Sequence, residues 1–369
     1  MLVVWMQCSQ PASPASRVET ANIDAPRWRD RAPFWLVHVA ALVGAIWIGW
    51  SWTAAAWLVG TYAVRMFAIT AGYHRYFAHR SFKTSRAFQL VLAVLGMGAA
   101  QQGPLWWAGH HRRHHRYSDQ PEDVHSPRQR GLWWAHLGWA LGSRYIETDH
   151  ERIRDFGRYP ELRFLDRHDA LFAIGYGVLL YAIGGPTALI WGHFVSLVAS
   201  WHVTFSINSL AHVWGRRRYK TGDDSRNNPL LAILTFGEGW HNNHHHYQRS
   251  ARQGFFWWEI DPSYYVLKLL ELVHLVRDVQ GVPRHVRDRV ASHARDPAHP
   301  ELHADLSTGT STNRGEPSST TSLSIPRSGP CGAPPCPPPT PTSSPPATRS
   351  CCATRPHWKA TTPPNTSCS

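Results

Sequence analysis

The sequence predicts an all-α integral membrane protein with four transmembrane helices. Two observations lead to this prediction: uncharged apolar stretches long enough to span a bilayer, and basic residues gathered at one end of each stretch. A third observation, three clusters of histidine beside these stretches, indicates the chemistry. The chain has 369 residues, 43% of them hydrophobic, which excludes a small disulfide-bonded module.

The four apolar stretches form two pairs. Residues 33–50 contain no charged side chain, and residues 51–70 contain a single arginine. About 20 apolar residues cross the roughly 30 Å of hydrocarbon as a helix. The second pair, 170–184 and 186–207, is joined by a Gly-Gly-Pro turn signal. The sequence therefore predicts two transmembrane hairpins.

Basic residues determine the predicted orientation. They precede the first and third spans and follow the second and fourth, whereas the hairpin turns carry no charge. These residues are Arg27, Arg29, Arg31, Arg75, Arg80, Lys83, Arg86, Arg163, Arg167, Arg216, Arg217, Arg218 and Lys220. The positive-inside rule then places both termini and the long connecting segments in the cytoplasm. Loops beside anionic lipid also explain the net charge of +13, so no nucleic-acid partner is predicted.

Three further apolar segments are predicted not to span the membrane. Residues 87–108 are uncharged, but a spanning helix here would put the neighbouring histidine clusters on opposite faces, and Gly98 and Gly103 disfavour an unbroken helix. Residues 131–142 are too short and carry three tryptophans, which is typical of an interfacial element. Residues 264–279 have the apolar spacing of an amphipathic helix.

These features divide the chain into three regions. Residues 1–32 are predicted to be an N-terminal cytoplasmic segment, and residues 33–285 the membrane domain. Residues 286–369 are rich in Pro, Ser and Thr, so a disordered tail without chemistry is expected there.

The three histidine clusters predict a metal centre. They are His74 and His79; His111, His114 and His115; and His241, His244 and His245. Residues three and four apart share a helix face, so the second and third clusters each direct imidazoles at one point. His74 and His79 are about 140° apart on an ideal helix, which requires a bend or a position between two ions.

Neutral imidazoles around a cation avoid the repulsion that gathered imidazolium groups would suffer. Eight or nine histidines suit two ions better than one, and Zn, Cu, Fe and Ni all accept imidazole ligands. A solvated face or an adventitious metal site is the ordinary alternative for any single cluster. A nitrogen-ligated site above apolar helices favours redox attack on a lipid chain over hydrolysis, for which a carboxylate base would be expected.

The order of the clusters resembles the three histidine boxes of the membrane fatty acyl desaturases, particularly the stearoyl-CoA (Δ9) desaturase type. The stretches Asn-Ser-Leu-Ala-His at 208–212 and Gly-Glu-Gly-Trp-His-Asn-Asn-His-His at 237–245 are similar to two further motifs of that family. The resemblance runs from about residue 33 to residue 268.

This resemblance implies a cytoplasmic helical cap that holds a dimetal site above the four spans. Two iron ions would be bound by His74, His79, His111, His114, His115, His212, His241, His244 and His245, with Asn208 reaching a metal through water. No catalytic residue beyond this metal centre is predicted. The implied reaction is O2-dependent desaturation of a long-chain acyl group, at Δ9 of a C16–C18 chain.

The resemblance also implies partners and an acyl tunnel. Electrons would come from a separate donor such as a ferredoxin or a cytochrome b5-like protein, and acyl-CoA is the carrier favoured by analogy. Gln101, Trp107 and Thr204 occupy the positions that bend the tunnel in the family. Gly109 and His110 stand where animal acyl-CoA enzymes carry an Arg-Asp pair, which removes one contact for CoA. His110 and His246 are interpreted as groups outside the ligand set, and the intramembrane His193 and His202 as neutral, hydrogen-bonded histidines.

Two other functions remain open at this point. A membrane diiron hydroxylase would share the histidine boxes and the O2 chemistry but would insert oxygen into a lipid or alkyl chain. A membrane metal-binding or transport protein would need ligands along a path through the spans, whereas the clusters here all lie at one predicted face.

Overall fold

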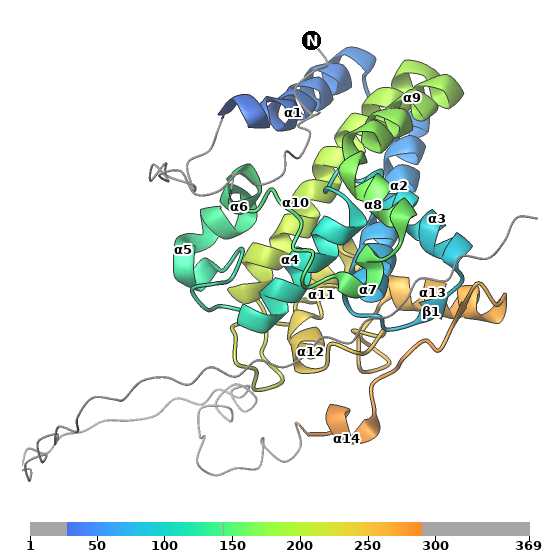
Figure 1. The fold of residues 1–369 in the computed structure, drawn as a ribbon. Coiled ribbons are helices and arrows are strands. Elements are labelled where there is room, and N and C mark those ends of the chain that lie inside the picture. The colour runs from blue at the N-terminus through green and yellow to red at the C-terminus, as the bar shows by residue number, and fades with distance from the viewer. Residues whose placement is uncertain (1–27, 143, 290–369) are drawn as a thin grey trace, which may run out of the picture. The chain divides into compact units, whose positions relative to one another are not determined.

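The computed structural model describes residues 28–142 and 144–289. In this part of the chain the structure is mostly helical, with one two-stranded sheet (Figure 1). The predicted segment 1–32 lies mostly outside the described residues, and the predicted tail 286–369 almost wholly so.

Long apolar helices form the frame of the molecule. They are α1 (Trp28–Ile48), α2 (Trp52–Phe67), η1 (Ala68–Ala78), α9 (Asp169–Thr187), η3 (Ala188–Val195), α10 (Ser196–Ser209) and η4 (Leu210–His212). Among the described residues, three stretches are long and apolar enough to cross a membrane: Arg31–Ile48, Trp52–Ala78 and Asp169–His212. Many of their large apolar side chains are exposed, as on a lipid-facing surface; Trp47 is 84% exposed.

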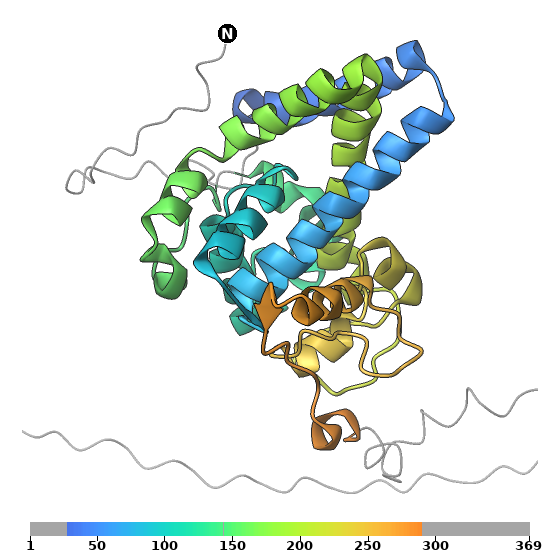
Figure 2. The same ribbon diagram turned by 90° about the vertical axis from the view of Figure 1, so that its right-hand side faces the viewer.

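The count of three differs from the four predicted spans, and the difference arises at one corner. Asp169–His212 has 44 residues, which as a straight helix would measure about 66 Å, twice the thickness of a bilayer core. Gly185, however, has φ +64°, a conformation that glycine adopts without strain. The chain reverses there, and η3 packs back against α9 (Figure 2). The corner coincides with the predicted Gly-Gly-Pro turn.

The first two long helices meet in a tight turn. The helix α1 ends at Ile48, and Gly49 has φ +73°. Ser51 then begins α2, because its hydroxyl accepts a hydrogen bond from the backbone N–H of Ala54 at 3.0 Å. The boundary therefore falls within two residues of the predicted one.

Residues 87–108 form two helices, as their glycines predict. The helix α3 (Arg86–Met97) begins at Ser85, which caps the N–H of Phe88, and α4 (Pro104–Tyr117) begins with proline in its first turn. Between them, Ala100 and Gln102 have positive φ, so no continuous helix passes through this segment.

The amphipathic segment 264–279 is helical only in its first part. The helix α13 (Pro262–Leu272) ends before His274, whose φ of 59° is incompatible with a continuing helix. The chain then forms β2 (Val276–Arg277), which pairs antiparallel with β1 (Lys83–Thr84). The prediction of helix to residue 279 was wrong, because pairing with a distant strand replaces about two turns of helix.

Short helices connect these elements, and the apolar segment 131–142 contributes three of them, with a kink at Gly131. They are α5 (Pro127–Trp133), η2 (Trp134–Gly138), α6 (Trp139–Leu141), α7 (Arg154–Gly157), α8 (Pro160–Arg167), α11 (Pro229–Leu234), α12 (His241–His246) and α14 (Arg284–Arg287).

One apolar core fixes the elements that carry the first two histidine clusters. Tyr73 and Phe77 of η1 pack with Leu92 of α3 and Leu105 of α4, all fully buried or nearly so. The histidines of η1 and α4 are therefore attached to a rigid apolar base.

Gly96 allows the close approach of α3 to η1. A Cβ at this position would lie 2.2 Å from the ring of Tyr73. We expect Gly96→Ala to lower the free energy of unfolding by about 1–3 kcal/mol, because the ring beside His74 must move. Thermal unfolding in detergent measures the effect. Gly60→Ala in α2 is the control, since nothing lies within 4 Å of its Cβ; equal losses in the two variants would contradict this account.

Candidate metal centre

The structure brings all nine predicted histidine ligands together in two adjacent groups. The five-histidine group is His74, His79, His111, His115 and His244. The four-histidine group is His114, His212, His241 and His245. Within each group one nitrogen per residue lies within 4.8 Å of all the others. The ligand candidates come from η1 and the residue that ends it, and from α4, η4 and α12, which are distant in sequence.

The Nε2 atoms of the five-histidine group form a closed ring. Consecutive atoms are 2.9–3.1 Å apart, in the order His74, His79, His111, His115, His244 and back to His74. A hydrogen bond joins one protonated and one unprotonated nitrogen. Donors and acceptors cannot alternate around a ring of five, so hydrogen bonding alone leaves at least one contact unsatisfied.

A wide helical turn solves the spacing problem of His74 and His79. The backbone N–H of His79 bonds to the carbonyl of His74, five residues earlier, at 3.1 Å. This π-type turn brings the two Nε2 atoms within 3.1 Å of each other. The helix is therefore locally widened, and both side chains belong to one group. Of the two arrangements considered for this pair, the bend is observed and a position between two ions is not required.

The four-histidine group has the same character. The Nε2 atoms of His212 and His241 are 3.1 Å apart. The Nε2 atoms of His114 and His245 are buried and have no hydrogen-bond partner among the described residues. Buried unpartnered nitrogens aimed at a common point are unusual unless an ion occupies that point.

Both groups fit metal ions. Two nitrogens bound at right angles to a metal, each about 2.1 Å away, are about 3.0 Å apart, which matches the observed spacing. Burial, together with neighbouring histidines, lowers the pKa of His79, His111, His115, His241 and His244 well below the ordinary value. These imidazoles are therefore neutral at pH 7 and offer lone pairs.

Four carboxylates, which the sequence analysis missed, orient the imidazoles from behind. Each lies 2.5–2.9 Å from an Nδ1 atom: Glu238 at His74, Asp123 at His114, Asp119 at His212 and Asp223 at His245. A carboxylate that accepts the Nδ1 proton fixes the tautomer and leaves Nε2 free for a metal. Glu238 lies inside the third histidine motif, and Asp119 and Asp123 follow the second cluster by a few residues. Their closeness in sequence to the histidines could have identified these three as candidate partners.

The aspartates are ionised in this environment. Burial alone raises the pKa of Asp119 and of Asp123, but hydrogen bonds and charge from His212 and His114 outweigh it and hold both pKa values below the usual range. Burial lowers the pKa of His245 to about 4, although Asp223 acts in the opposite direction.

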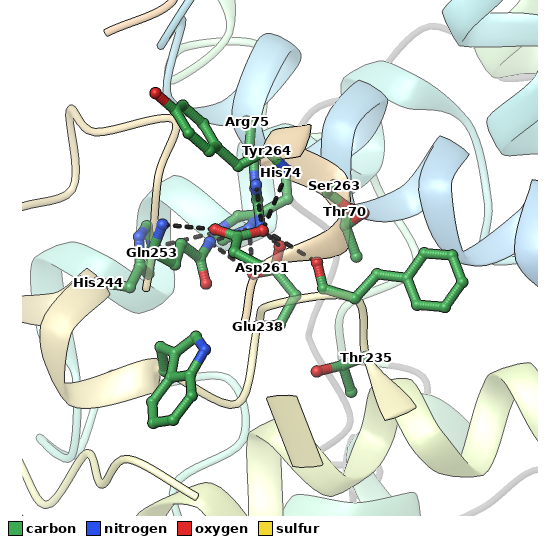
Figure 3. A network of polar contacts seen from close by, with 12 residues as sticks. Thr70, His74, Arg75, Thr235, Glu238, His244, Gln253, Asp261, Ser263 and Tyr264 are labelled. Atoms are coloured by element: carbon green, nitrogen blue, oxygen red, sulfur yellow. Dashed lines mark hydrogen bonds and ion pairs between the residues drawn. The ribbon is translucent and has the colours of Figure 1, made fainter. Parts of the chain in front are cut away.

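A polar network holds Glu238 in place (Figure 3). Arg75 contacts Glu238 at 3.3 Å and Asp261 at 2.9 Å. Gln253 donates from its side chain to Glu238 at 2.8 Å and from its backbone to Asp261 at 2.7 Å. A buried arginine beside two carboxylates leaves no uncompensated positive charge, and it ties η1 to the loop after α12.

An apolar cavity of about 680 Å³ leads to the five-histidine group. Its walls come from α1, α4, α6, α9, η3 and α10, and His111 and Asn208 lie at its surface. The predicted tunnel residues all line it. Gln101 donates to Thr204 at 3.2 Å and accepts from Trp107 at 3.4 Å. The three side chains therefore form one connected wall.

The remaining histidines lie outside both groups. His110 is buried and donates to the backbone oxygen of Tyr145 at 3.1 Å, while His246 stacks on Tyr219 at 4.0 Å. His193 contacts Arg65, and His202 lies between His38 and His136. His125 was not singled out from the sequence, yet it lines the cavity and packs against His114 at 4.4 Å.

Comparison with known proteins agrees with this geometry. The family model described as fatty acid desaturase matches residues 50–262. Delta-9 acyl-lipid desaturase 2 of Arabidopsis thaliana is 39% identical over 274 residues, covering 72% of this chain and 88% of that protein. Acyl-CoA 5-desaturase AL21 of Anemone leveillei is 40% identical over 261 residues, covering 69% and 80%. The sn-1 stearoyl-lipid 9-desaturase of Anabaena variabilis is 37% identical over 270 residues, covering 71% and 97%. The chain belongs to the fatty acid desaturase family and is therefore an oxidoreductase.

Proposed function

We propose that this protein introduces a double bond into a long-chain acyl group, at Δ9 of a C16–C18 chain, with O2 as co-substrate. The observation that carries the proposal is the closed ring of five imidazoles at the end of an apolar cavity. The names of the relatives support the position, because two of those compared act at carbon 9.

Iron is the metal we propose for both histidine groups, since an unactivated C–H bond is beyond the reach of side-chain acids and bases. Bound iron would supply the O2 activation that removes two hydrogens. The balanced reaction consumes one O2, two electrons and two protons per double bond and releases two waters. The electrons would come from a separate ferredoxin or cytochrome b5-like protein.

The protein's own residues would position the chain. Trp107 stacks on His111 with ring centroids 4.9 Å apart, so the cavity wall touches a ligand directly. The hydrogen bond from Gln101, which lies between α3 and α4, to Thr204 of α10 closes that wall. We propose that this wall holds two adjacent methylenes beside the metal centre and that Asn208 contacts a metal through water.

We further propose a chain attached to a membrane lipid as the substrate. The relatives include acyl-lipid and acyl-CoA desaturases. Val178 and Tyr181 line the cavity and are also more than half exposed on α9, so this wall faces the lipid side. His110, at the position of the missing Arg-Asp pair, is buried against Tyr145 and presents no cation to CoA phosphates.

The membrane topology that we propose has four spans. Each arm of Asp169–His212 would cross once, with the corner at Gly185 outside and both termini and the metal centre cytoplasmic. Domain bounds of 33–285 include the whole family match.

Product analysis tests the reaction. We expect expression in a host without the activity, together with a reducing system, to yield a new monounsaturated fatty acid in gas chromatography. A membrane diiron hydroxylase would give hydroxylated chains instead, and hydroxylated chains alone would reject desaturation. A metal-binding or transport protein would give neither. Supplying the chain on CoA, on acyl-carrier protein and on phospholipid in parallel identifies the carrier; exclusive use of acyl-CoA would reject the lipid proposal.

His212 tests the ligand set. We expect His212→Ala to lower activity by more than about 100-fold and to reduce bound iron, because even the loss of an outer partner of a ligand costs about 10–100-fold in metal affinity. His246→Ala, which removes the stack on Tyr219 and a contact of 3.4 Å with the backbone oxygen of Val286, should retain most activity and iron. Iron analysis and turnover of both purified variants make the comparison. Full activity in His212→Ala would show that the ligand set is wrong.

Ala173 tests the cavity as the acyl site. Ala173 and Ala182 both lie on α9, but only Ala173 lines the cavity. We expect Ala173→Trp to lower desaturation of a C18 chain by about 10- to 100-fold, because a misplacement of about 1 Å has that effect on a reacting group. Ala182→Trp should leave turnover near the wild-type value. Equal turnover in the two variants would place the acyl chain elsewhere.

A further inference from the structure

The carboxylates behind the ligands are distributed unequally between the two histidine groups. In the four-histidine group, three of the four Nδ1 atoms face an aspartate: His114 faces Asp123 at 2.8 Å, His212 faces Asp119 at 2.9 Å, and His245 faces Asp223 at 2.6 Å. In the five-histidine group, the ion pairs of the described residues include one carboxylate, Glu238 at His74, at 2.5 Å. The Nδ1 atoms of His115 and His244 are buried without a partner in this part of the chain.

The charges around these carboxylates also differ between the two groups. Glu238 is paired with the buried Arg75, which also binds Asp261 (Figure 3). The three aspartates of the other group form no ion pair with lysine or arginine among the described residues. Their additional partners are neutral: Asp119 accepts from Ser126 and from the backbone of Asp224, and Asp223 accepts from Ser225.

Formal charge therefore differs between the two positions. Three carboxylates without a lysine or arginine partner stand behind the four-histidine group, whereas Glu238 and Asp261 share Arg75 and leave one negative charge behind the five-histidine group. A carboxylate on Nδ1 raises the basicity of the ligand, and losing one typically costs about 10–100-fold in metal affinity. A difference of two such carboxylates corresponds to a difference of about 100- to 10,000-fold in metal affinity in favour of the four-histidine group. The fifth imidazole of the other group reduces this difference.

We propose that the two metal positions are unequal, and that the four-histidine position binds a divalent cation more tightly and fills first. The inference rests on the proposed dimetal function and adds an order of loading to it. Asp119, Asp123 and Asp223 are then positioning residues for the tight position, and Glu238 is the positioning residue for the weak one.

Cobalt(II) titration of the full-length, metal-free protein in detergent tests this order. Co2+ accepts imidazole ligands, and its visible absorption reports coordination. We expect two resolved steps of one ion each. Asp123→Asn and, independently, Asp223→Asn should weaken the tight step by about 10–100-fold, whereas Glu238→Gln should weaken the second step by a similar factor and leave the first unchanged.

Asp224→Asn is the matched control, because Asp224 adjoins Asp223 but its side chain pairs with Arg128 and Arg217 instead of a histidine. Neither step should change in this variant. Circular dichroism of each metal-free variant verifies that it is folded, and the two aspartate variants provide independent tests if one does not fold.

A single unresolved step in the wild type would overturn the proposal, as would an effect of Glu238→Gln on the tight step. The result is separate from that of the product assay. Ordered metal binding without an unsaturated product would reject the proposed desaturation and support the order of loading. An active desaturase with two equal binding steps would support desaturation and reject the order of loading.

Discussion

The structure depends on holding five neutral imidazole nitrogens in a closed ring whose contacts hydrogen bonding cannot all satisfy. Five Nε2 atoms in a closed ring with sides near 3 Å have no arrangement of protons that satisfies every contact. The ring persists because η1, α4 and α12 are fixed elsewhere, by an apolar core and by the network around Arg75. A bound cation would satisfy all five nitrogens at once, so folding and metal affinity are coupled.

Four carboxylates orient imidazoles of the two groups by contacting their Nδ1 atoms, on the side of each imidazole opposite the proposed metal. Each ionised aspartate fixes its imidazole with Nδ1 protonated, which directs the Nε2 lone pair inward. Asp119 also links elements that are remote in sequence, since it contacts His212 and the backbone of Asp224. The loop after α4 therefore has two functions: it orients proposed ligands, and it joins His212, just after α10, to the segment that contains Asp224.

Local patterns predicted most of the fold and eight of the nine members of the two histidine groups, whereas His212 was predicted from the resemblance to the desaturase family. The apolar stretches, the Gly-Gly-Pro corner and the glycines before α4 each act within a few residues, so sequence spacing contains their outcome. The carboxylate partners depend on contacts across long separations, such as the 93 residues between Asp119 and His212. The same limit explains the end of α13, where β2 pairs with a strand nearly 200 residues earlier. The spacing of five residues between His74 and His79 predicted that some distortion was needed, but it did not specify that the helix would widen at His79.

The helix α4 connects the two halves of the proposed site. Trp107 forms part of the cavity wall, and one turn later His111 begins the ligand cluster of the same helix. Because helix geometry fixes the rise between them at about 6 Å, any shift of the wall also shifts the ligands. The hydrogen bonds from Trp107 to Gln101 and from Gln101 to Thr204 extend this constraint to α10. The distance between an acyl chain in this cavity and the histidine ring would thus be set by α4, and the position of a double bond would follow from the hydrogen bonds that join Trp107, Gln101 and Thr204.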